Sequence, residues 1–237
     1  MKDVVNLKDL DGELKKEHAE VQKVMNELNK KGVDYLVDGL TDSGGKAKFW
    51  EQAYFLKKLK LKEGMDVLDV GSGGSIFPAL LAKRGCNVYV VEKNKARLDA
   101  YIPIMEALKV NIKLILGDVN DVLELGIEFD RITCISVLEH NEAPEDLEMM
   151  KCFYKLLKAN GILGISVDFY RIYMQRKKVD TKVFWWVPPQ IYSETKFKEI
   201  IRKAHFKYAF KHNWKNWTPE IYGIYTSAAA VLQKKVK

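Results

Sequence analysis

The sequence has few cysteines and no long apolar run, and both absences limit what the chain does. Its 237 residues include three cysteines, Cys86, Cys134 and Cys152, without the C-x-x-C spacing of a zinc site or a redox pair. They are odd in number and lie in segments that read as structured, so we expect reduced core thiols and no metal site. No apolar run approaches the ~20 residues needed to span a bilayer.

The first residues also lack the apolar core of a secretory signal. Acidic residues follow the initial methionine almost at once, beginning with Asp3, which argues against secretion. Together with the cysteine usage, this predicts a cytoplasmic protein without a membrane span. We find no internal repeat and no low-complexity linker.

The composition is that of an ordinary soluble globular protein. Hydrophobic residues make up 47% and charged residues 30% of the chain, and its length allows one sizeable core. The formal net charge of +7 permits an anionic partner such as nucleic acid but does not require one. Many lysines, among them Lys57, Lys58 and Lys60, stand opposite apolar residues at helical spacing, which is typical of a solvated face.

Apolar periodicity predicts a mixed α/β fold. Two helices, over 14–28 and around 49–59, precede the first strand. Buried strands are expected at 67–70, 87–92, 112–116, within 129–138 and at 162–167, with two late strands at 205–210 and 223–232. Helices separate them, among them one from Ala96 to Leu108 and one that opens at Pro144 and runs to Lys158. This alternation predicts a mostly parallel sheet covered on both faces. We therefore expect an N-terminal helical cover over residues 1–62 and an α/β domain over residues 63–237.

The most informative segment is a glycine-rich turn between the first core strand and the next helix. Asp69 precedes Gly71 and Gly73, and the helix opens near Ile76. A strand, a glycine turn and a helix hold a nucleotide-like ligand against backbone N–H groups. A dinucleotide fingerprint G-x-G-x-x-G would need glycine where Ile76 stands. The carboxylate of Asp69 also suits a cationic ligand better than a pyrophosphate.

This turn resembles the first motif of the class I S-adenosylmethionine-dependent methyltransferases, D/E-x-G-x-G-x-G. Asp69, Gly71 and Gly73 match the motif, and Ser75 stands in place of its third glycine. The resemblance implies that the turn, including Ser72, binds S-adenosylmethionine and that Asp69 holds the methionine amino group. It also implies a Rossmann-like, seven-stranded, mostly parallel sheet with helices on both faces and an antiparallel C-terminal strand.

Two further acidic residues end the second and third strands. Glu92 lies about 20 residues after the glycine turn, where a nucleotide-binding fold places a carboxylate on the ribose hydroxyls. The alternative is a surface glutamate beside Lys93. By the same resemblance, Asp118 accepts a hydrogen bond from the adenine amine, and the backbone N–H of Val119 meets a ring nitrogen. Asp118 is also a good helix N-cap, and both roles can hold at once.

The fourth strand is followed by the run Ser136-Val137-Leu138-Glu139-His140. It resembles a run that many small-molecule methyltransferases carry at the edge of the cofactor. The resemblance implies that Ser136 and Val137 lie beneath the methionine portion and that Glu139 and His140 face the reaction chamber. His140 is either a general base or an orienting hydrogen-bond donor.

The segment 169–190 follows the fifth strand and mixes aromatic with basic residues. We expect it to be a lid over the crevice, with Tyr170, Tyr173 and Trp185 on the substrate side. Three interpretations remain open: stacking on nucleic acid, aromatic anchors packed on the sheet, and a pocket for an aromatic or anionic metabolite.

The sequence reveals the cofactor better than the acceptor, because an activated sulfonium methyl asks mainly for alignment and exclusion of water. Trp50 and Tyr54 are expected to lean over the cofactor from the N-terminal cover. No N/D-P-P-Y/F motif follows the fourth strand, and the chain is compact, so we expect a small-molecule acceptor. The alternatives are an RNA or protein methyltransferase, a non-catalytic S-adenosylmethionine-binding subunit and a Rossmann oxidoreductase.

Overall fold

The computed structural model describes residues 4–5, 7–35, 43–170, 174–175, 189–210, 215–217 and 226–235. The strands are β1 (Val4–Val5), β2 (Asp66–Val70), β3 (Asn87–Glu92), β4 (Ile112–Leu116), β5 (Phe129–Ile135), β6 (Leu157–Phe169), β7 (Met174–Gln175), β8 (Gln190–Ile191), β9 (Phe206–Tyr208), β10 (Lys215–Trp217) and β11 (Thr226–Lys234). The helices are α1 (Leu7–Lys30), α2 (Ser43–Lys58), α3 (Phe77–Lys83), α4 (Lys95–Asp99), α5 (Tyr101–Leu108), α6 (Val119–Glu124), the short 3-10 helix η1 (Leu138–His140), α7 (Glu145–Leu156) and α8 (Glu194–Lys203).

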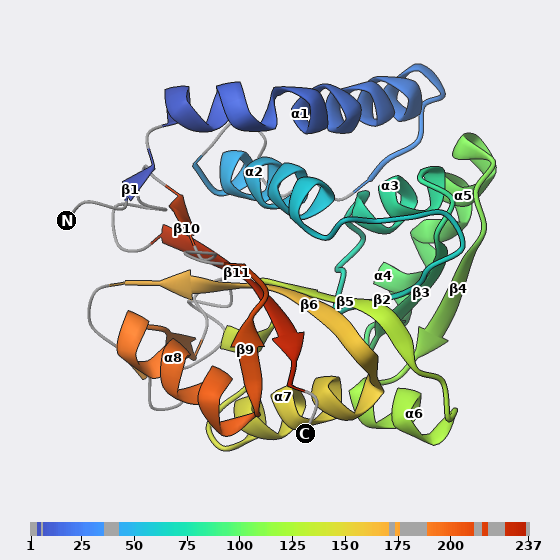
Figure 1. Ribbon diagram of the computed structural model, residues 1–237. Coiled ribbons are helices and arrows are strands. Elements are labelled where there is room, and N and C mark those ends of the chain that lie inside the picture. The colour runs from blue at the N-terminus through green and yellow to red at the C-terminus, as the bar shows by residue number, and fades with distance from the viewer. Residues whose placement is uncertain are drawn as a thin grey trace.

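One large sheet carries the fold (Figure 1), with strand order β1-β10-β11-β6-β5-β2-β3-β4. The pairs from β6 to β4 are all parallel, and β11 runs antiparallel to β6. Short strands β9 and β10 pair with different parts of the same edge of β11. The predicted seven-stranded, mostly parallel sheet with an antiparallel C-terminal strand is confirmed, and β1 extends it beyond β10.

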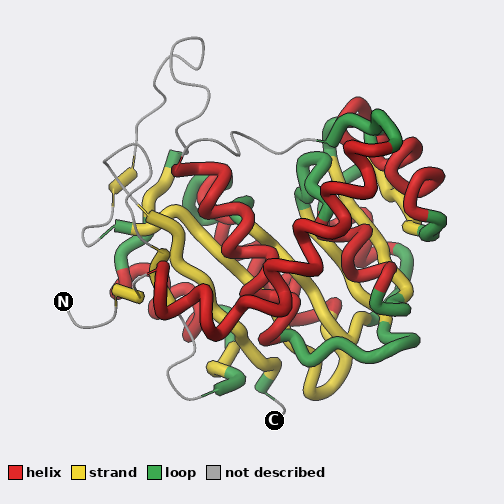
Figure 2. The backbone as a smooth tube through the Cα atoms, turned by 90° about the horizontal axis from the view of Figure 1, so that it is seen from above, coloured by secondary structure: helices red, strands yellow, loops and turns green. Residues whose placement is uncertain are grey.

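Helices cover both faces of the sheet. In Figure 1, α1 to α5 lie on one side, and α6, α7 and α8 lie on the other. The view from above in Figure 2 shows helices lying over the strands. Each face has its own hydrophobic cluster. β3 shows the effect of this double cover. Its residues from Val88 onward are all buried, as expected for a parallel strand covered on both faces.

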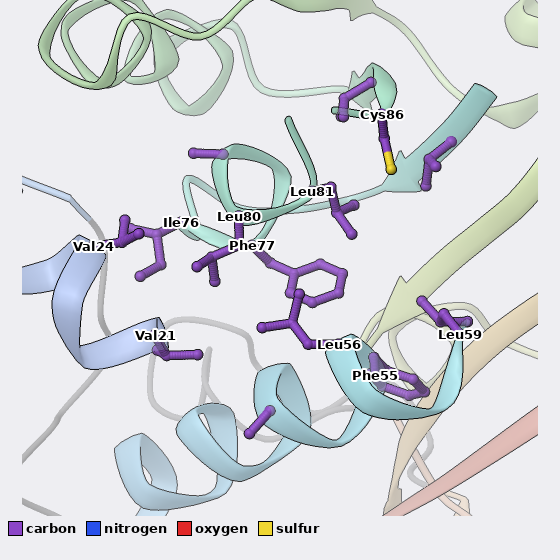
Figure 3. Packing of buried hydrophobic residues seen from close by; sticks show 14 of the residues in the cluster. Val21, Val24, Phe55, Leu56, Leu59, Ile76, Phe77, Leu80, Leu81 and Cys86 are labelled. Carbon is purple, nitrogen blue, oxygen red and sulfur yellow. The ribbon is translucent and has the colours of Figure 1, made fainter. Parts of the chain in front are cut away.

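The helix α2 packs directly on the sheet because β6 offers it a glycine. A Cβ added at Gly164 would come within 2.8 Å of the Phe55 ring and 3.0 Å of Leu59, so a larger side chain there would push α2 away. Figure 3 shows how α1, α2 and α3 meet, with Val24 of α1 close to Ile76. The first core strand and the N-terminal helices thus share one hydrophobic cluster.

Some element boundaries differ from those predicted. The expected helix from Ala96 to Leu108 is two helices that meet at Ala100. Pro103 lies in the first turn of α5, where its missing N–H is tolerated. The helix expected to run to Lys158 ends at Leu156, because Leu157 already pairs with Phe129 of β5.

Candidate active site

The glycine-rich turn follows β2 and lies against the segment after β5. Gly71, Gly73 and Gly74 all have positive φ angles, of 65°, 60° and 88°. A Cβ at Gly71 would lie 2.8 Å from Cγ2 of Val137, so only glycine fits this contact without displacement. The Ser75 N–H donates to the Ser72 carbonyl at 2.9 Å, which closes the turn.

Asp69 is a buried carboxyl group at the base of this turn, with 2% of its surface exposed. The hydroxyl of Thr133 on β5 donates to its Oδ1. Burial raises the pKa of Asp69 to about 7, with a further increase from the charge of Glu92, while the Thr133 bond acts in the opposite direction. A cationic group at this carboxyl would therefore stabilise its ionised form.

Glu92 holds the glycine turn through its carboxylate. The Gly73 N–H donates to Oε2 at 3.2 Å, and the Asn94 N–H donates to Oε1 at 3.0 Å. Glu92 is 8% exposed, so the alternative of a surface glutamate is wrong. Each carboxylate oxygen has two lone pairs, which leaves acceptor capacity for hydroxyl donors.

Asp118 is the N-cap of α6, as predicted. Its Oδ1 accepts from the Asn120 N–H at 2.7 Å, and the Asp121 side chain accepts from its own N–H, which completes a capping box. Partial burial opposes ionisation, but the Asn120 N–H and the charge of Lys93 outweigh it, so the pKa of Asp118 is lowered. Val119 is the first residue of α6, where backbone N–H groups lack an intrahelical partner.

The segment after β5 is tied to β6 and to α2. Ser136 has a left-handed φ of 53°, and its N–H donates to both the hydroxyl and the carbonyl of Ser166 on β6. Its own hydroxyl donates to Oε1 of Glu51 at 3.1 Å. Ser136 therefore connects the rim of the sheet with the helix above it.

Glu139 and His140 lie in η1 but differ in exposure. Glu139 has no exposed surface, and its Oε1 accepts from the Asp168 N–H at 3.2 Å. Burial and then the charge of Asp168 raise its pKa well above the ordinary value. Because Glu139 is fully enclosed, the prediction that it faces an open chamber is wrong for this structure.

His140 keeps solvent-accessible area, although neighbouring protein crowds it. Desolvation by that protein, followed by the charges of Lys48 and Arg97, lowers its pKa to about 4. The ordinary value of about 6.5 and the lowered one both leave the imidazole neutral at physiological pH. His140 can thus accept a proton, but with weak affinity.

Sequence reasoning missed three polar residues of α2. Lys48 Nζ lies 3.3 Å from Oε2 of the fully buried Glu51, and Gln52 Nε2 donates to Ser75 Oγ at 3.2 Å. Burial opposes the Lys48 ammonium, but the carboxylates of Glu51, Glu139 and Asp168 outweigh it, and the pKa of Lys48 is raised. The helix also carries polar residues near both of its ends, so the sequence gives no signal that separates residues 48, 51 and 52 from an exposed polar face.

Comparison with known proteins assigns the chain to a protein family. A family model described as a methyltransferase domain matches residues 49–209. The chain belongs to this family. The predicted resemblance to class I methyltransferases is confirmed.

One curated relative shows how much of the chain is shared. A ubiquinone biosynthesis O-methyltransferase of Coxiella burnetii (strain RSA 493 / Nine Mile phase I) is 34% identical over 113 residues, which cover 48% of this chain and 47% of that protein. The chain thus spans about half the length of this curated relative.

Two solved structures have the same fold. A Burkholderia thailandensis 1,6-didemethyltoxoflavin-N1-methyltransferase with bound S-adenosylhomocysteine has a TM-score of 0.63 at 17% identity, covering 92% of this chain and 88% of that one. The cyclase SpnF has a TM-score of 0.63 at 15% identity, covering 86% and 87%. At such identities the likeness concerns the fold alone, and the fold does not fix the reaction.

The remaining predicted site residues of the methyltransferase domain are placed as follows. Trp50 and Tyr54 are buried on α2 with stacked rings, 5.3 Å between centroids. Tyr170 follows β6, is partly buried, and its N–H donates to the Tyr192 carbonyl at 2.8 Å. Tyr173 and Trp185 lie outside the described residues. The predicted contacts of these side chains with cofactor or substrate stay predictions.

The part of the chain that the structure describes contains no group of three or more His, Cys, Asp or Glu side chains that could hold a metal ion. Within the same part of the chain, no helix has the length and apolar character needed to cross a membrane. All three cysteines are buried free thiols.

Proposed function

We propose that this protein transfers the methyl group of S-adenosylmethionine to a small-molecule acceptor. The observation that carries the proposal is the placement of three acidic residues along one edge of the sheet. Asp69 lies at the end of β2, Glu92 ends β3 and Asp118 follows β4, and these three strands are neighbours and parallel. Membership of the methyltransferase-domain family supports the same function.

The residues at this edge fit the chemical groups of the cofactor. Asp69 is a buried carboxyl whose pKa of about 7 calls for a cationic partner, and we assign it the methionine amino group. Gly71, Ser72 and Gly73 form the turn against which the ligand packs. Glu92 is assigned to the ribose hydroxyls, and Asp118 with the Val119 N–H to the adenine ring.

The bound cofactor supplies a sulfonium methyl that is already activated for displacement. The protein then has to align the acceptor, exclude water and, for a hydroxyl or amine, accept a proton. We assign proton acceptance to His140, which is neutral at physiological pH. Ser136 is assigned to the methionine end, with Trp50 and Tyr54 over the cofactor.

For the acceptor we propose a small molecule that binds between α2 and the segment after β6. Tyr170, Tyr173 and Trp185 are assigned to this side, as the sequence predicts. The curated relative in Coxiella burnetii is named as an O-methyltransferase of ubiquinone biosynthesis, which supports a small acceptor over a nucleic acid. The buried free thiols support a reducing, cytoplasmic location.

Calorimetry with S-adenosylhomocysteine and NAD tests the cofactor assignment directly. We expect saturable binding of S-adenosylhomocysteine and none of NAD. Binding of NAD alone would contradict the proposal. Turnover is then sought with labelled S-adenosylmethionine in fractionated metabolite extracts. A chain that binds the cofactor but labels no fraction would instead be a non-catalytic binding subunit.

The role of His140 needs a separate test once an acceptor is found. In His140→Ala we expect S-adenosylhomocysteine to bind as in the wild type while kcat falls. Because the general base acts only on the acceptor proton, unchanged kcat in this variant would remove His140 from that role.

A further inference from the structure

Two consecutive residues of α2 bind two different loops at the edge of the sheet. Glu51 Oε1 accepts from Ser136 Oγ at 3.1 Å, and Gln52 Nε2 donates to Ser75 Oγ at 3.2 Å. Ser75 closes the glycine turn after β2, and Ser136 follows β5, the strand beside β2. Neighbouring helix residues point about 100° apart. The helix reaches both loops because it lies over the place where they meet.

The two loops also contact each other. The isopropyl group of Val137 packs against Gly71 so closely that a Cβ there would lie 2.8 Å away. The glycine turn, the segment after β5 that carries Ser136 and Val137 (the β5 loop) and α2 therefore all contact one another. A shift of α2 would change the support of both loops at once.

Packing alone does not explain polar residues at these positions. Glu51 has no exposed surface and Gln52 is 8% exposed, whereas their neighbours Ala53, Phe55 and Leu56 fill the apolar core. Burying a carboxylate or an amide is unfavourable unless hydrogen bonds compensate it. An apolar side chain of similar size would be buried at lower cost.

The backbone at Ser136 needs external support, and Ser75 accepts hydrogen bonds from other parts of the chain. Ser136 has a φ of 53°, a region that non-glycine residues occupy at a cost when surrounding contacts fix them. Ser75 accepts the Tyr101 hydroxyl at its carbonyl, at 2.8 Å, and its Oγ accepts the Phe77 N–H at 3.1 Å. The hydrogen bonds from Glu51 and Gln52 of α2 add to those that already hold Ser136 and Ser75.

The second carboxylate oxygen of Glu51 faces a charged group on its own helix. Lys48, one turn before Glu51, lies 3.3 Å from the second oxygen of that carboxylate and is influenced by the charges of Glu139 and Asp168. The Glu51 carboxylate is thus shared between Lys48 on its own helix and Ser136 after β5.

We propose that Glu51 and Gln52 are positioning residues, which hold the β5 loop and the glycine turn in the shape that binds the cofactor without touching it themselves. This inference rests on the proposed function. Its consequence is that affinity for the adenosyl ligand depends on the side chains of an N-terminal helix outside the nucleotide-binding strands.

The first test is Gln52→Met, which keeps the buried volume and removes the donor. We expect the Kd for S-adenosylhomocysteine, measured by calorimetry, to rise at least about fivefold and the ligand to dissociate faster. The matched control is Glu20→Gln, which weakens the pair between Glu20 and Arg84 (2.6 Å) and so loosens α1 on α3, away from both loops. Its Kd should equal that of the wild type.

Glu51 is tested with an apolar and a conservative variant. Glu51→Leu removes the acceptor for Ser136 and should raise the Kd, whereas Glu51→Gln keeps an acceptor and should restore most of the affinity. If Glu51 had only a structural role, both variants would lose affinity equally and would also lose the same stability toward urea. We therefore measure the Kd and the free energy of unfolding of each variant.

A double-mutant cycle shows whether Gln52 acts through Ser75. If it does, Gln52→Met combined with Ser75→Ala binds no more weakly than the weaker single variant. Wild-type affinity in both Gln52→Met and Glu51→Leu overturns the inference, as does an equal loss in Glu20→Gln. Failure of the wild type to bind S-adenosylhomocysteine would overturn the proposed function instead.

Discussion

Three carboxyl groups along one edge of the sheet have different electrostatic surroundings. Asp69 is enclosed, and burial raises its pKa to about 7. Glu92 accepts two backbone N–H groups, and Asp118 has a lowered pKa because its hydrogen bond and Lys93 outweigh partial burial. Residues of one chemical type can thus take different parts of one ligand: a cation at Asp69, and neutral donors at the other two.

Because the pKa of Asp69 is raised, we expect cofactor binding to depend on pH. Below pH 7 the carboxyl is mostly protonated, so it must lose a proton to pair with an amino group, and affinity falls as pH falls. We expect the Kd for S-adenosylhomocysteine to rise about tenfold between pH 8 and pH 6. Asp69→Asn should bind weakly and with little pH dependence over this range. The assignment would be contradicted if the Kd of the wild type did not change with pH, or if the Kd of Asp69→Asn changed with pH as steeply as that of the wild type.

Glu92→Ala should weaken binding of S-adenosylhomocysteine by about 1–3 kcal/mol, because it removes the proposed ribose acceptor and strands buried donors. One of those donors is the Gly73 N–H, so the turn itself loses support. Calorimetry of the variant measures the loss, and Glu106→Ala, an exposed carboxylate on α5, is the control. Unchanged affinity would remove Glu92 from the ribose assignment.

At the scale of secondary-structure elements, the glycine turn after β2 packs against the segment after β5 with no room for a side chain at Gly71. Gly71→Ala should destabilise the protein through both its φ of 65° and the clash with Val137. Gly126→Ala is the matched control, since Gly126 has the same φ and nothing within 4 Å of the added Cβ. We expect Gly126→Ala to lower the free energy of unfolding by about 1–2 kcal/mol and Gly71→Ala to lower it by more.

The two glycine variants should also differ in how well they bind the ligand. We expect urea denaturation to separate the two glycine variants and calorimetry to show weakened ligand binding in Gly71→Ala alone. Adding Val137→Ala to Gly71→Ala relieves the clash and should recover part of the stability. Equal effects of the two glycine variants would show that the contact with Val137 is unimportant.

The elements at the cofactor edge were predictable because strand ends and turns carry local signals. Asp69, Glu92 and Asp118 follow apolar runs directly, so their common edge follows from the parallel order. Glu51 and Gln52 were not predictable, since their partners Ser136 and Ser75 are far away in sequence. Nothing local distinguishes a buried polar residue on α2 from an exposed one.

At the scale of the whole molecule, the sheet positions the site by bringing together segments that are distant in sequence. The neighbouring strands β2 and β5 are separated by about 60 residues, and β6 is covered by a helix from the N-terminal part. The mostly parallel sheet was predictable from the alternation of elements, and its antiparallel C-terminal strand from the family resemblance. The short strands β1 and β10 were not, because two or three residues give no periodic pattern.

The predicted division into a cover over 1–62 and a domain over 63–237 leads to a prediction about folding. Because α1 and α2 share one hydrophobic cluster with β2 and β3, we expect both parts to unfold together. Leu28→Ala, at a fully buried position of α1, should lower the free energy of unfolding by about 2–5 kcal/mol. Urea transitions followed by circular dichroism and by tryptophan fluorescence, to which Trp50 contributes, should shift together, whereas exposed Lys16→Ala should shift neither. A separate early transition in Leu28→Ala would instead mean that the cover folds independently of the sheet.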